Sequence, residues 1–297
     1  MELYDASNCR IMAADWALSK SSGAERSRAE VVFCLSDKKR MRQVSNFSTE
    51  QNALLRRFPK SRPALSPEYR KIYLEEIRIN RGERGGWFYR LLVALESWMH
   101  RQVARPDSSA TILEIGAGTL NHLAYEPAAA IYDIVEPVPD LYRDSPAKVR
   151  VRAAFKDMSD VPLEHLYGRI VSIAAMEHIE SLPECIARAG IALEEGGILH
   201  IAIPSEGGFL WGLSWRWTTG VLFRLRTGLD YAPLMRFEHI NSADEIVKIL
   251  ECFFEKTYIR RFPLPLRHLS FYTAIEAKIP RRDLCRRYLA ERGVLRG

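Results

Sequence analysis

The spacing of apolar residues divides the chain into a helical N-terminal part and a longer part in which strands and helices alternate. From Ser66 apolar side chains recur at helical spacing, and a second helical pattern begins at Trp87, after a glycine-containing break at 82–86. From Ala110 onward the pattern changes to short apolar runs that are typical of buried strands. These runs span residues 111–115, 130–135, 149–153, 170–174, 198–203, 257–262 and 271–276.

Amphipathic segments between the runs carry helix start signals. Ser181 with Glu184, and Ser242 with Glu245, have the form of a capping box, and the glycines at 196–197 end the first of these helices. Strands that alternate with helices form a mostly parallel sheet covered on both faces. The last two runs are joined only by a proline-bearing link at 263–269, so we expect them to pair antiparallel.

The fold class predicted is therefore α/β: a Rossmann-like, seven-stranded, mostly parallel sheet with helices on both faces, plus an N-terminal helical extension. Residues 1–40 show no period, and an ordered pattern begins at Met41, where we expect the functional protein to start. The domain boundaries predicted are a poorly defined, partly disordered extension (1–65), a helical segment (66–109), the sheet domain (110–280) with an insertion (205–236), and a basic C-terminal tail (281–297).

The segment ILEIGAGTLNHL, residues 112–123, carries the first chemical signal. An apolar strand runs into a Gly-x-Gly turn and then into a helix; Gly116 allows the turn and Gly118 lets a ligand approach the backbone. A dinucleotide fingerprint needs a third glycine where Asn121 stands, which counts against NAD or FAD. Glu114, just before the turn, suits a ligand with an ammonium or sulfonium group better than a diphosphate.

Two further carboxylates follow the next two strands. Glu136 ends the second strand 20 residues after Gly116, the distance at which a carboxylate meets ribose hydroxyls in such folds. Asp157 follows the third strand, where it can accept a hydrogen bond from an adenine amino group. The fourth strand ends in IAAMEHI, residues 173–179, and the fifth leads into ILHIAIPSEGG, residues 198–208.

These five segments, in this order and spacing, resemble the class I S-adenosylmethionine-dependent methyltransferases over residues 111–278. Within that class the chain is similar to the bacterial small-molecule group, whose fourth strand commonly closes on a Glu-His pair. The resemblance implies S-adenosyl-L-methionine as cofactor and no metal. It departs from many members at Thr119 and Leu120, which stand where a third glycine is common. The cofactor-binding residues that it implies are Glu114, Gly116 and Gly118 at the methionine portion, Glu136 at the ribose, Asp157 and Met158 at the adenine, and Ala174 and Ala175 through backbone groups. Ala117 and Pro137, next to these residues, are expected to bind the cofactor as well.

Methyl transfer to a hydroxyl needs alignment and a base near neutral pH, most often histidine. His178 lies at the carboxyl end of the fourth strand, where open parallel sheets bind ligands. Glu177 beside it could orient it or meet the acceptor. His239 in RFEHIN, residues 236–241, is a second candidate base. A structural histidine that binds a neighbouring loop is the alternative for each.

The insertion at 205–236 is rich in aromatic residues and arginine. A loop of this length is usually a lid or binding element. Aromatic faces stack on sugars and arginines bind phosphates, so one interpretation is a cap over a glycosyl acceptor. A rival interpretation is a basic, aromatic interfacial helix that makes peripheral membrane contact through 208–226. The third is ordinary packing of a helical excursion.

The 297 residues carry a net charge of +6, with basic clusters at 38–42, 56–62, 260–267 and 281–292. No RNA-binding motif accompanies them, so a nucleic-acid partner is not expected. Five cysteines, an odd number without metal-ligand spacing, fit a reducing cytoplasm. No signal peptide is visible, and the longest apolar stretch, 208–223, is too short and polar to span a bilayer.

The function predicted is S-adenosylmethionine-dependent methylation of a small molecule or glycan, with the O-methylation of a sugar in surface polysaccharide biosynthesis as a specific hypothesis. Two alternatives stay open. One is a non-catalytic, methyltransferase-like binding module. The other is a nicotinamide-dependent oxidoreductase, against which Asn121 counts. No feature of the sequence indicates an oligomeric state.

Overall fold

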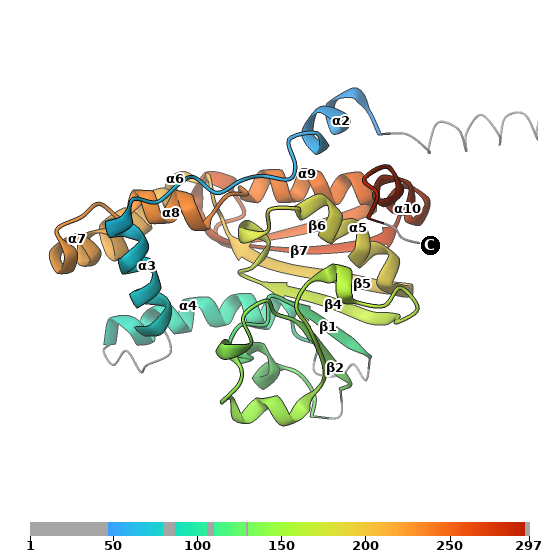
Figure 1. The fold of residues 1–297 in the computed structure, drawn as a ribbon, viewed down its shortest axis with the longest axis horizontal. Coiled ribbons are helices and arrows are strands. Elements are labelled where there is room, and N and C mark those ends of the chain that lie inside the picture. Colours follow the sequence, from blue (N-terminus) through green and yellow to red (C-terminus); the bar gives the residue numbers. More distant parts are fainter. Residues whose placement is uncertain (1–46, 80–86, 106–109, 129, 295–297) are drawn as a thin grey trace, which may run out of the picture. The chain divides into compact units, whose positions relative to one another are not determined.

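A computed structural model describes residues 47–79, 87–105, 110–128 and 130–294 (Figure 1). The expected start at Met41 lies outside the described residues. The predicted seven-stranded sheet is confirmed, with the strand order β3-β2-β1-β4-β5-β7-β6. The strands are β1 (Ile112–Ile115), β2 (Tyr132–Val135), β3 (Val151–Phe155), β4 (Tyr167–Ile173), β5 (Leu193–Pro204), β6 (Phe254–Pro263) and β7 (Ser270–Pro280).

The first five strands are parallel, and β7 runs antiparallel between β5 and β6. The antiparallel pairing predicted for the last two strands is therefore confirmed. Because β1 to β5 all point the same way, the loops that follow them meet at one edge of the sheet. This edge is where parallel α/β sheets bind ligands.

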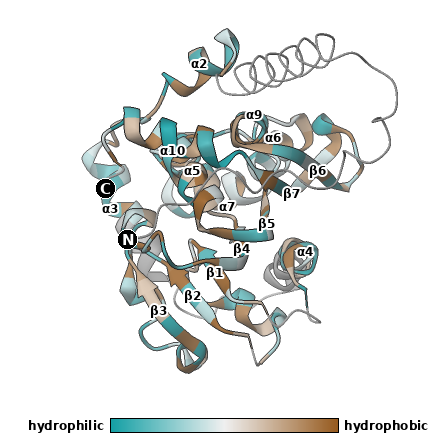
Figure 2. Cartoon of the chain, turned by 90° about the vertical axis from the view of Figure 1, so that its right-hand side faces the viewer, coloured by the Kyte–Doolittle hydropathy of each residue, from teal (hydrophilic) through white to brown (hydrophobic). Residues whose placement is uncertain are grey.

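Helices cover both faces of the sheet, as predicted, and the residues of β1, β2 and β4 are buried on both sides almost throughout. One face is covered by α5 (Leu182–Ala192), α9 (Ala243–Phe253) and α10 (Arg282–Glu291), which pack against one another. The other face is covered by α4 (Trp87–Val103), which contacts β4, β5 and β7. Figure 2 shows α4 on the opposite side of the strands from α5 and α10.

The expectation of a poorly defined extension up to residue 65 is wrong for residues 47–65. Ser48 begins α2 (Thr49–Leu55) with a complete capping box to Gln51. Leu55 and Phe58 are buried in the same core cluster as α9. The chain then crosses the molecule as an N-terminal strap, residues 56–66, before α3 (Pro67–Ile79). Within the strap Phe58 is buried, and Lys60 and Arg62 donate to backbone carbonyls of the sheet domain. These anchors show no period because the strap is not a regular element.

The expectation of a basic tail at 281–297 is also wrong over residues 282–291, which form α10. Leu284, Cys285, Tyr288 and Leu289 are buried against the core, while the arginines lie on the outer face. The apolar positions have the i, i+1, i+4, i+5 spacing of one helical face. The high arginine content hides this pattern when the segment is interpreted by charge alone.

The helix start signals have mixed outcomes. Ser242 caps α9 through a hydrogen bond from the Glu245 backbone amide, whereas the Ser181 side chain caps nothing at the start of α5. The latter helix ends at Ala192, and β5 begins before the glycines at 196–197. The insertion is helical: α6 (Phe209–Trp215), a π-helical turn η6 (Arg216–Gly220), α7 (Val221–Thr227) and α8 (Ala232–Glu238).

Candidate functional site

A cavity of about 720 Å³ lies at the carboxyl ends of the parallel strands. It brings together loops that follow β1, β2, β3 and β4. Nine of the residues singled out from the sequence line it: Gly116, Gly118, Glu136, Pro137, Asp157, Met158, Ala174, Ala175 and His178.

The two glycines of the turn after β1 are needed for different reasons. Gly116 has φ +75°, and a Cβ added to it would lie 2.2 Å from Cβ of Ala175, so it is needed where this turn touches the loop after β4. Gly118 has φ +51° and open space where a side chain would be. Only the second glycine therefore leaves room for a ligand against the backbone, as the sequence predicts for it.

The Glu136 carboxylate joins the loop after β2 to this turn. Its Oε2 accepts a hydrogen bond from Gly118 N at 2.8 Å, and its Oε1 accepts one from Val138 N at 2.9 Å. The residue is 5% exposed. Each oxygen of a carboxylate can accept a second hydrogen bond. Glu136 is thus fixed by two amides and keeps one acceptor site on each oxygen.

Asp157 opens the loop after β3. Its Oδ1 accepts a hydrogen bond from Ser159 N at 2.7 Å, and the Asp160 carboxylate in turn accepts one from Asp157 N. Within the described part of the chain, Oδ2 has no hydrogen bond. Buried Met158 and the neighbouring Ile179 add an apolar wall to the cavity. The loop therefore offers one carboxylate oxygen beside a surface suited to a flat ring.

Glu114 and Ala117 are not among the residues that line the cavity. Glu114 is fully buried and accepts a hydrogen bond from the Tyr132 hydroxyl at 2.8 Å. Burial raises the pKa of Glu114 to about 8, although the hydrogen bond from Tyr132 opposes the rise. Its contact with a cationic ligand stays a prediction, and the structure shows it as a support of β1 and β2. Ala117 packs in the apolar cluster beneath α4.

His178 lines the cavity and has a fixed ring orientation. Its Nδ1 lies 2.7 Å from the Glu238 carbonyl oxygen, so this nitrogen carries the proton and donates it. Burial lowers the pKa of His178, although the hydrogen bond to Glu238 opposes the fall. The ring is therefore neutral near pH 7, with its lone pair on Nε2. This is the tautomer and charge state that a general base requires.

Glu177 and His239 lie beside His178 but do not line the cavity. The rings of His178 and His239 are perpendicular, with centroids 4.9 Å apart. Glu177 is 1% exposed, and burial raises its pKa to about 7. His239 Nδ1 lies 2.7 Å from Glu206 Oε1. Burial lowers the pKa of His239, but the carboxylates of Glu206 and Glu177 raise it by more, so this histidine tends to be protonated.

Several residues that line the cavity were not expected there from the sequence. Arg62 of the N-terminal strap donates to the His178 carbonyl at 2.8 Å and to the Phe237 carbonyl at 3.1 Å. Arg188 of α5 and Val294, which follows α10, line the opposite side. No local motif marks these residues, because each reaches the site through long-range packing.

The expectation of an α-helix after the Gly-x-Gly turn is wrong. Only a short 3₁₀ helix, η1 (Asn121–Tyr125), follows, after Leu120 in a left-handed conformation. His122 is buried there, with Nε2 3.0 Å from Glu126 Oε1, and it stacks on His100 of α4. His122 is therefore a packing residue on the far side of the turn.

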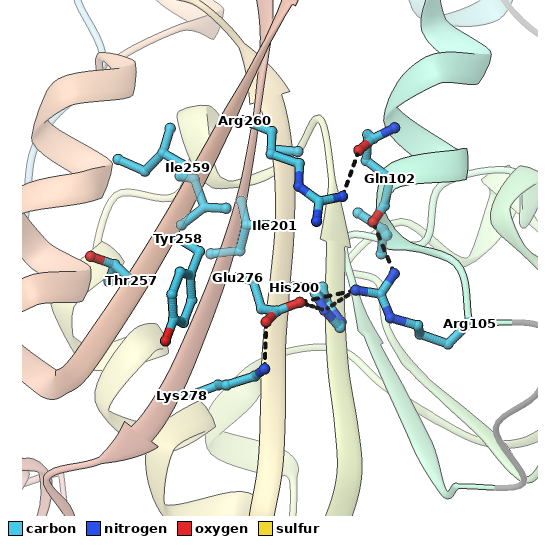
Figure 3. A pocket seen from close by; sticks show the side chains of 13 residues that line it. Gln102, Arg105, His200, Ile201, Thr257, Tyr258, Ile259, Arg260, Glu276 and Lys278 are labelled. Carbon is cyan, nitrogen blue, oxygen red and sulfur yellow. Dashed lines mark hydrogen bonds and ion pairs between the residues drawn. The ribbon is translucent and has the colours of Figure 1, made fainter. Parts of the chain in front are cut away.

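A second hollow, of about 560 Å³, lies on the face of β5, β7 and β6 beside the end of α4 (Figure 3). Arg105, His200 and Lys278 all point toward Glu276 there. Although burial opposes it, hydrogen bonds from Lys278 and His200 lower the pKa of Glu276 to about 2. These groups satisfy one another in mid-sheet, away from the strand ends, so we assign the network to the packing of α4 on the sheet.

No protein-family model matches the sequence, and no curated protein matches it. Solved structures of similar fold share few residues with it. A possible exported protein from Bordetella parapertussis is 13% identical, with 80% of both chains covered and a TM-score of 0.46. N-methyltransferase NodS from Bradyrhizobium japonicum, in complex with S-adenosyl-L-homocysteine, is 11% identical, with 68% of this chain and 96% of that one covered and a TM-score of 0.45.

An O-methyltransferase family protein from Burkholderia thailandensis is 16% identical, with a TM-score of 0.44. The match covers 64% of this chain and 58% of the other, so this chain spans little more than half of that protein's length. At these identities the likeness concerns the fold.

Proposed function

We propose that the chain is an S-adenosylmethionine-dependent methyltransferase that acts on a small molecule or glycan. The observation that carries the proposal is the composition of the strand-end cavity. A glycine turn with open space, a carboxylate fixed by two amides and a neutral histidine with its lone pair on Nε2 converge there. A binding module without catalysis has no need of the histidine.

The residues present fit this cofactor. Glu136 keeps one acceptor site on each oxygen, which suits the two neighbouring hydroxyls of a ribose. Asp157 Oδ2 can accept from an adenine amino group while Met158 and Ile179 contact the ring. Gly118 leaves space for the amino-acid portion. When bound, S-adenosylmethionine supplies a methyl group on a positively charged sulfur.

We assign the general base to His178. Its Nδ1 proton is donated to the Glu238 carbonyl, so the lone pair is on Nε2, which lies 3.9 Å from Glu177 Oε1 and can accept a proton from a hydroxyl acceptor. Arg62 fixes the backbone of the same residue. His239 is the weaker candidate because it does not line the cavity and because, although burial opposes the rise, Glu206 and Glu177 raise its pKa.

For the acceptor we propose a hydroxylated small molecule or sugar, which enters from the side of His239 and the insertion. Trp211 of α6 stacks on His239 with ring centroids 6.4 Å apart, and its Nε1 donates to Glu206 Oε1 at 2.7 Å. An indole beside a carboxylate is a common arrangement for holding a sugar, because the ring packs on the apolar face and the carboxylate accepts from hydroxyls.

The experiment that tests the proposal is incubation of the protein with S-adenosylmethionine and a cell extract, with S-adenosylhomocysteine and methylated products measured by mass spectrometry. We expect His178→Asn to lower kcat by about 10²–10⁴-fold while cofactor affinity changes little. Asn can still donate to the Glu238 carbonyl, so the local fold is retained.

The wild-type rate should also rise with pH through a transition below 6.5, because protonated His178 cannot accept a proton and burial lowers its pKa from that value. His239→Asn is the matched comparison and should retain most activity. Loss of activity in His239→Asn with full activity in His178→Asn would contradict the assignment of the base. The absence of any methylated product and of S-adenosylhomocysteine would contradict the proposed function.

A further inference from the structure

The insertion carries a row of exposed apolar side chains on one side of α6, η6 and α7. We call this row the outer stripe. Its members recur every four residues and are 66%, 41%, 73%, 41% and 80% exposed, in chain order. They are Phe209, Leu213, Trp217, Val221 and Leu225.

The π-helical turn η6 keeps these residues in one row. Steps of four residues in an α-helix drift by about 40° each, because each residue turns by about 100°. A π-helical turn takes more residues per turn, so it reduces this drift in the middle of the row. Figure 1 shows α7 projecting beyond the strands on the left of the view.

The opposite side of the same helices is apolar too and is already packed. Phe223 is buried against Tyr231, Trp215 contacts Tyr231, and Trp211 lies against Tyr272 of β7. The inward side of these helices is therefore already occupied, and the outer stripe is a second apolar side. A helix that is apolar all round needs cover on both sides, and large exposed apolar patches mark interaction sites.

Within the segment 207–229, which carries the outer stripe, the charged residues all have one sign. Residues 207–229 contain Arg216, Arg224 and Arg226, each on an exposed part of the helix, and no aspartate or glutamate. No helix in the described ranges is long and apolar enough to cross a membrane. An apolar row flanked by arginines and lacking acids is the composition of a helix that lies in the interface of an anionic bilayer.

We propose that the outer stripe docks the protein on an anionic lipid surface. The apolar side chains enter the boundary of headgroups and acyl chains, and the arginines bind lipid phosphates. A second copy of the chain is a poorer occupant, because a twofold interface would bring the same arginines of both copies together. Trp211 of α6, the first of the docked helices, lies beside the proposed acceptor entrance, so the lipid surface would lie near the side from which an acceptor enters.

The test is co-sedimentation of the full chain with vesicles of phosphatidylcholine alone or mixed with phosphatidylglycerol, at low and high salt. We expect binding to the mixed vesicles that weakens at high salt. Trp217→Ser combined with Leu225→Ser should lower the partition coefficient by about tenfold or more. Arg224→Gln should lower it by about fivefold. Val149→Ser, which removes an exposed apolar side chain beside β3, is the matched control and should leave binding unchanged.

Four results would overturn the proposal, and the last of them is a lowered melting temperature of the stripe variant. The first is no binding to the mixed vesicles, and the second is equal binding by the wild type and the Trp217→Ser, Leu225→Ser variant. The third is a dimer in sedimentation velocity that this variant abolishes, since the stripe would then be covered by a second copy. The variant's melting temperature should equal that of the wild type, because exposed side chains contribute little to stability. A lower melting temperature would show that the chain itself covers the stripe.

Discussion

Glu114 and Glu136, which lie close to the same turn, differ in their partners and exposure to the cavity, and we therefore expect them to have different roles. Glu136 is fixed by two backbone amides and faces the cavity. Glu114 is buried and accepts a hydrogen bond from the Tyr132 hydroxyl, and burial raises its pKa to about 8. We therefore assign ligand binding to Glu136 and structural support to Glu114.

Glu114 should make the protein's stability depend on pH. Its pKa is about 8 in the folded protein against an ordinary value of 4.5, so the folded state holds the proton more tightly than the unfolded state. The contribution of Glu114 to the free energy of unfolding should be highest below pH 4.5 and should fall as the pH rises toward 8. The contribution is at most about 1.4 kcal/mol per pH unit.

Glu114→Gln should remove this component, because the amide oxygen can still accept from Tyr132 but does not titrate. Urea unfolding at several pH values measures the difference, and the variant should gain on the wild type as pH rises from 5 to 8. Parallel pH profiles for the two proteins would contradict the burial argument. Glu255→Gln, at an exposed position in β6, serves as control and should follow the wild type.

The two glycines of the turn should respond differently to alanine. Gly118→Ala should cost about 1–2 kcal/mol for its left-handed backbone and should mainly weaken cofactor binding, since its side chain enters open space. Gly116→Ala should cost about 3 kcal/mol or more, because its Cβ also clashes with Ala175. Thermal unfolding with and without S-adenosylhomocysteine separates the two effects. Equal losses of stability would refute the contact between the two loops.

At the scale of elements, the two ends of the described chain complete the sheet domain. The N-terminal strap crosses the loop after β4 through Arg62, and Lys60 Nζ donates to the Ile240 carbonyl at 2.7 Å. α10 packs on α5 and α9. Removal of either end segment should therefore destabilise the core and also disrupt the cavity.

The buried face of α10 gives the prediction at this scale. Leu289→Ala should lower the free energy of unfolding by about 2–5 kcal/mol, because the leucine is fully buried. Arg286→Ala, on the exposed side of the same helix, should have little effect. Chemical denaturation measures both variants. An unchanged free energy of unfolding in Leu289→Ala would indicate that this segment is a tail and does not pack on the core.

The existence of the strands could be predicted from their apolar residues, although β5 and β6 begin before the predicted runs at 198 and 257. The antiparallel pairing of the last two strands follows from the length of their connection, since the 263–269 link is too short for a crossover. The ends of the sheet domain could not be predicted. The strap has no period, and the apolar face of α10 is concealed among arginines that point to solvent.

The candidate site was predictable where a residue follows a strand. Gly118, Glu136 and Asp157 line the cavity because strand ends converge at one edge. Arg62 and Val294 could not be found in this way, since they reach the cavity from positions far away in the sequence. The sequence does name His239 as a candidate base, but its place beside His178, in contact with Glu206 and Trp211, depends on long-range packing.

For the whole molecule, the cavity depends on segments from 62 to 294, so cofactor binding and stability should be linked. A ligand that binds only the folded protein raises its stability in proportion to the logarithm of its concentration. S-adenosylhomocysteine should therefore raise the melting temperature, while NAD should leave it unchanged. A shift with NAD alone would favour the nicotinamide-dependent alternative.

Isothermal titration calorimetry with S-adenosylhomocysteine tests the central claim most directly, because it needs no acceptor. We predict one binding site in the wild type and an affinity about 10–100-fold lower in Glu136→Gln, which loses charge-assisted hydrogen bonds to the ribose. Asp140→Asn, an exposed acid of the same loop that is paired with Arg143, should bind like the wild type. No binding by the wild type, or equal affinity in Glu136→Gln, would contradict the account.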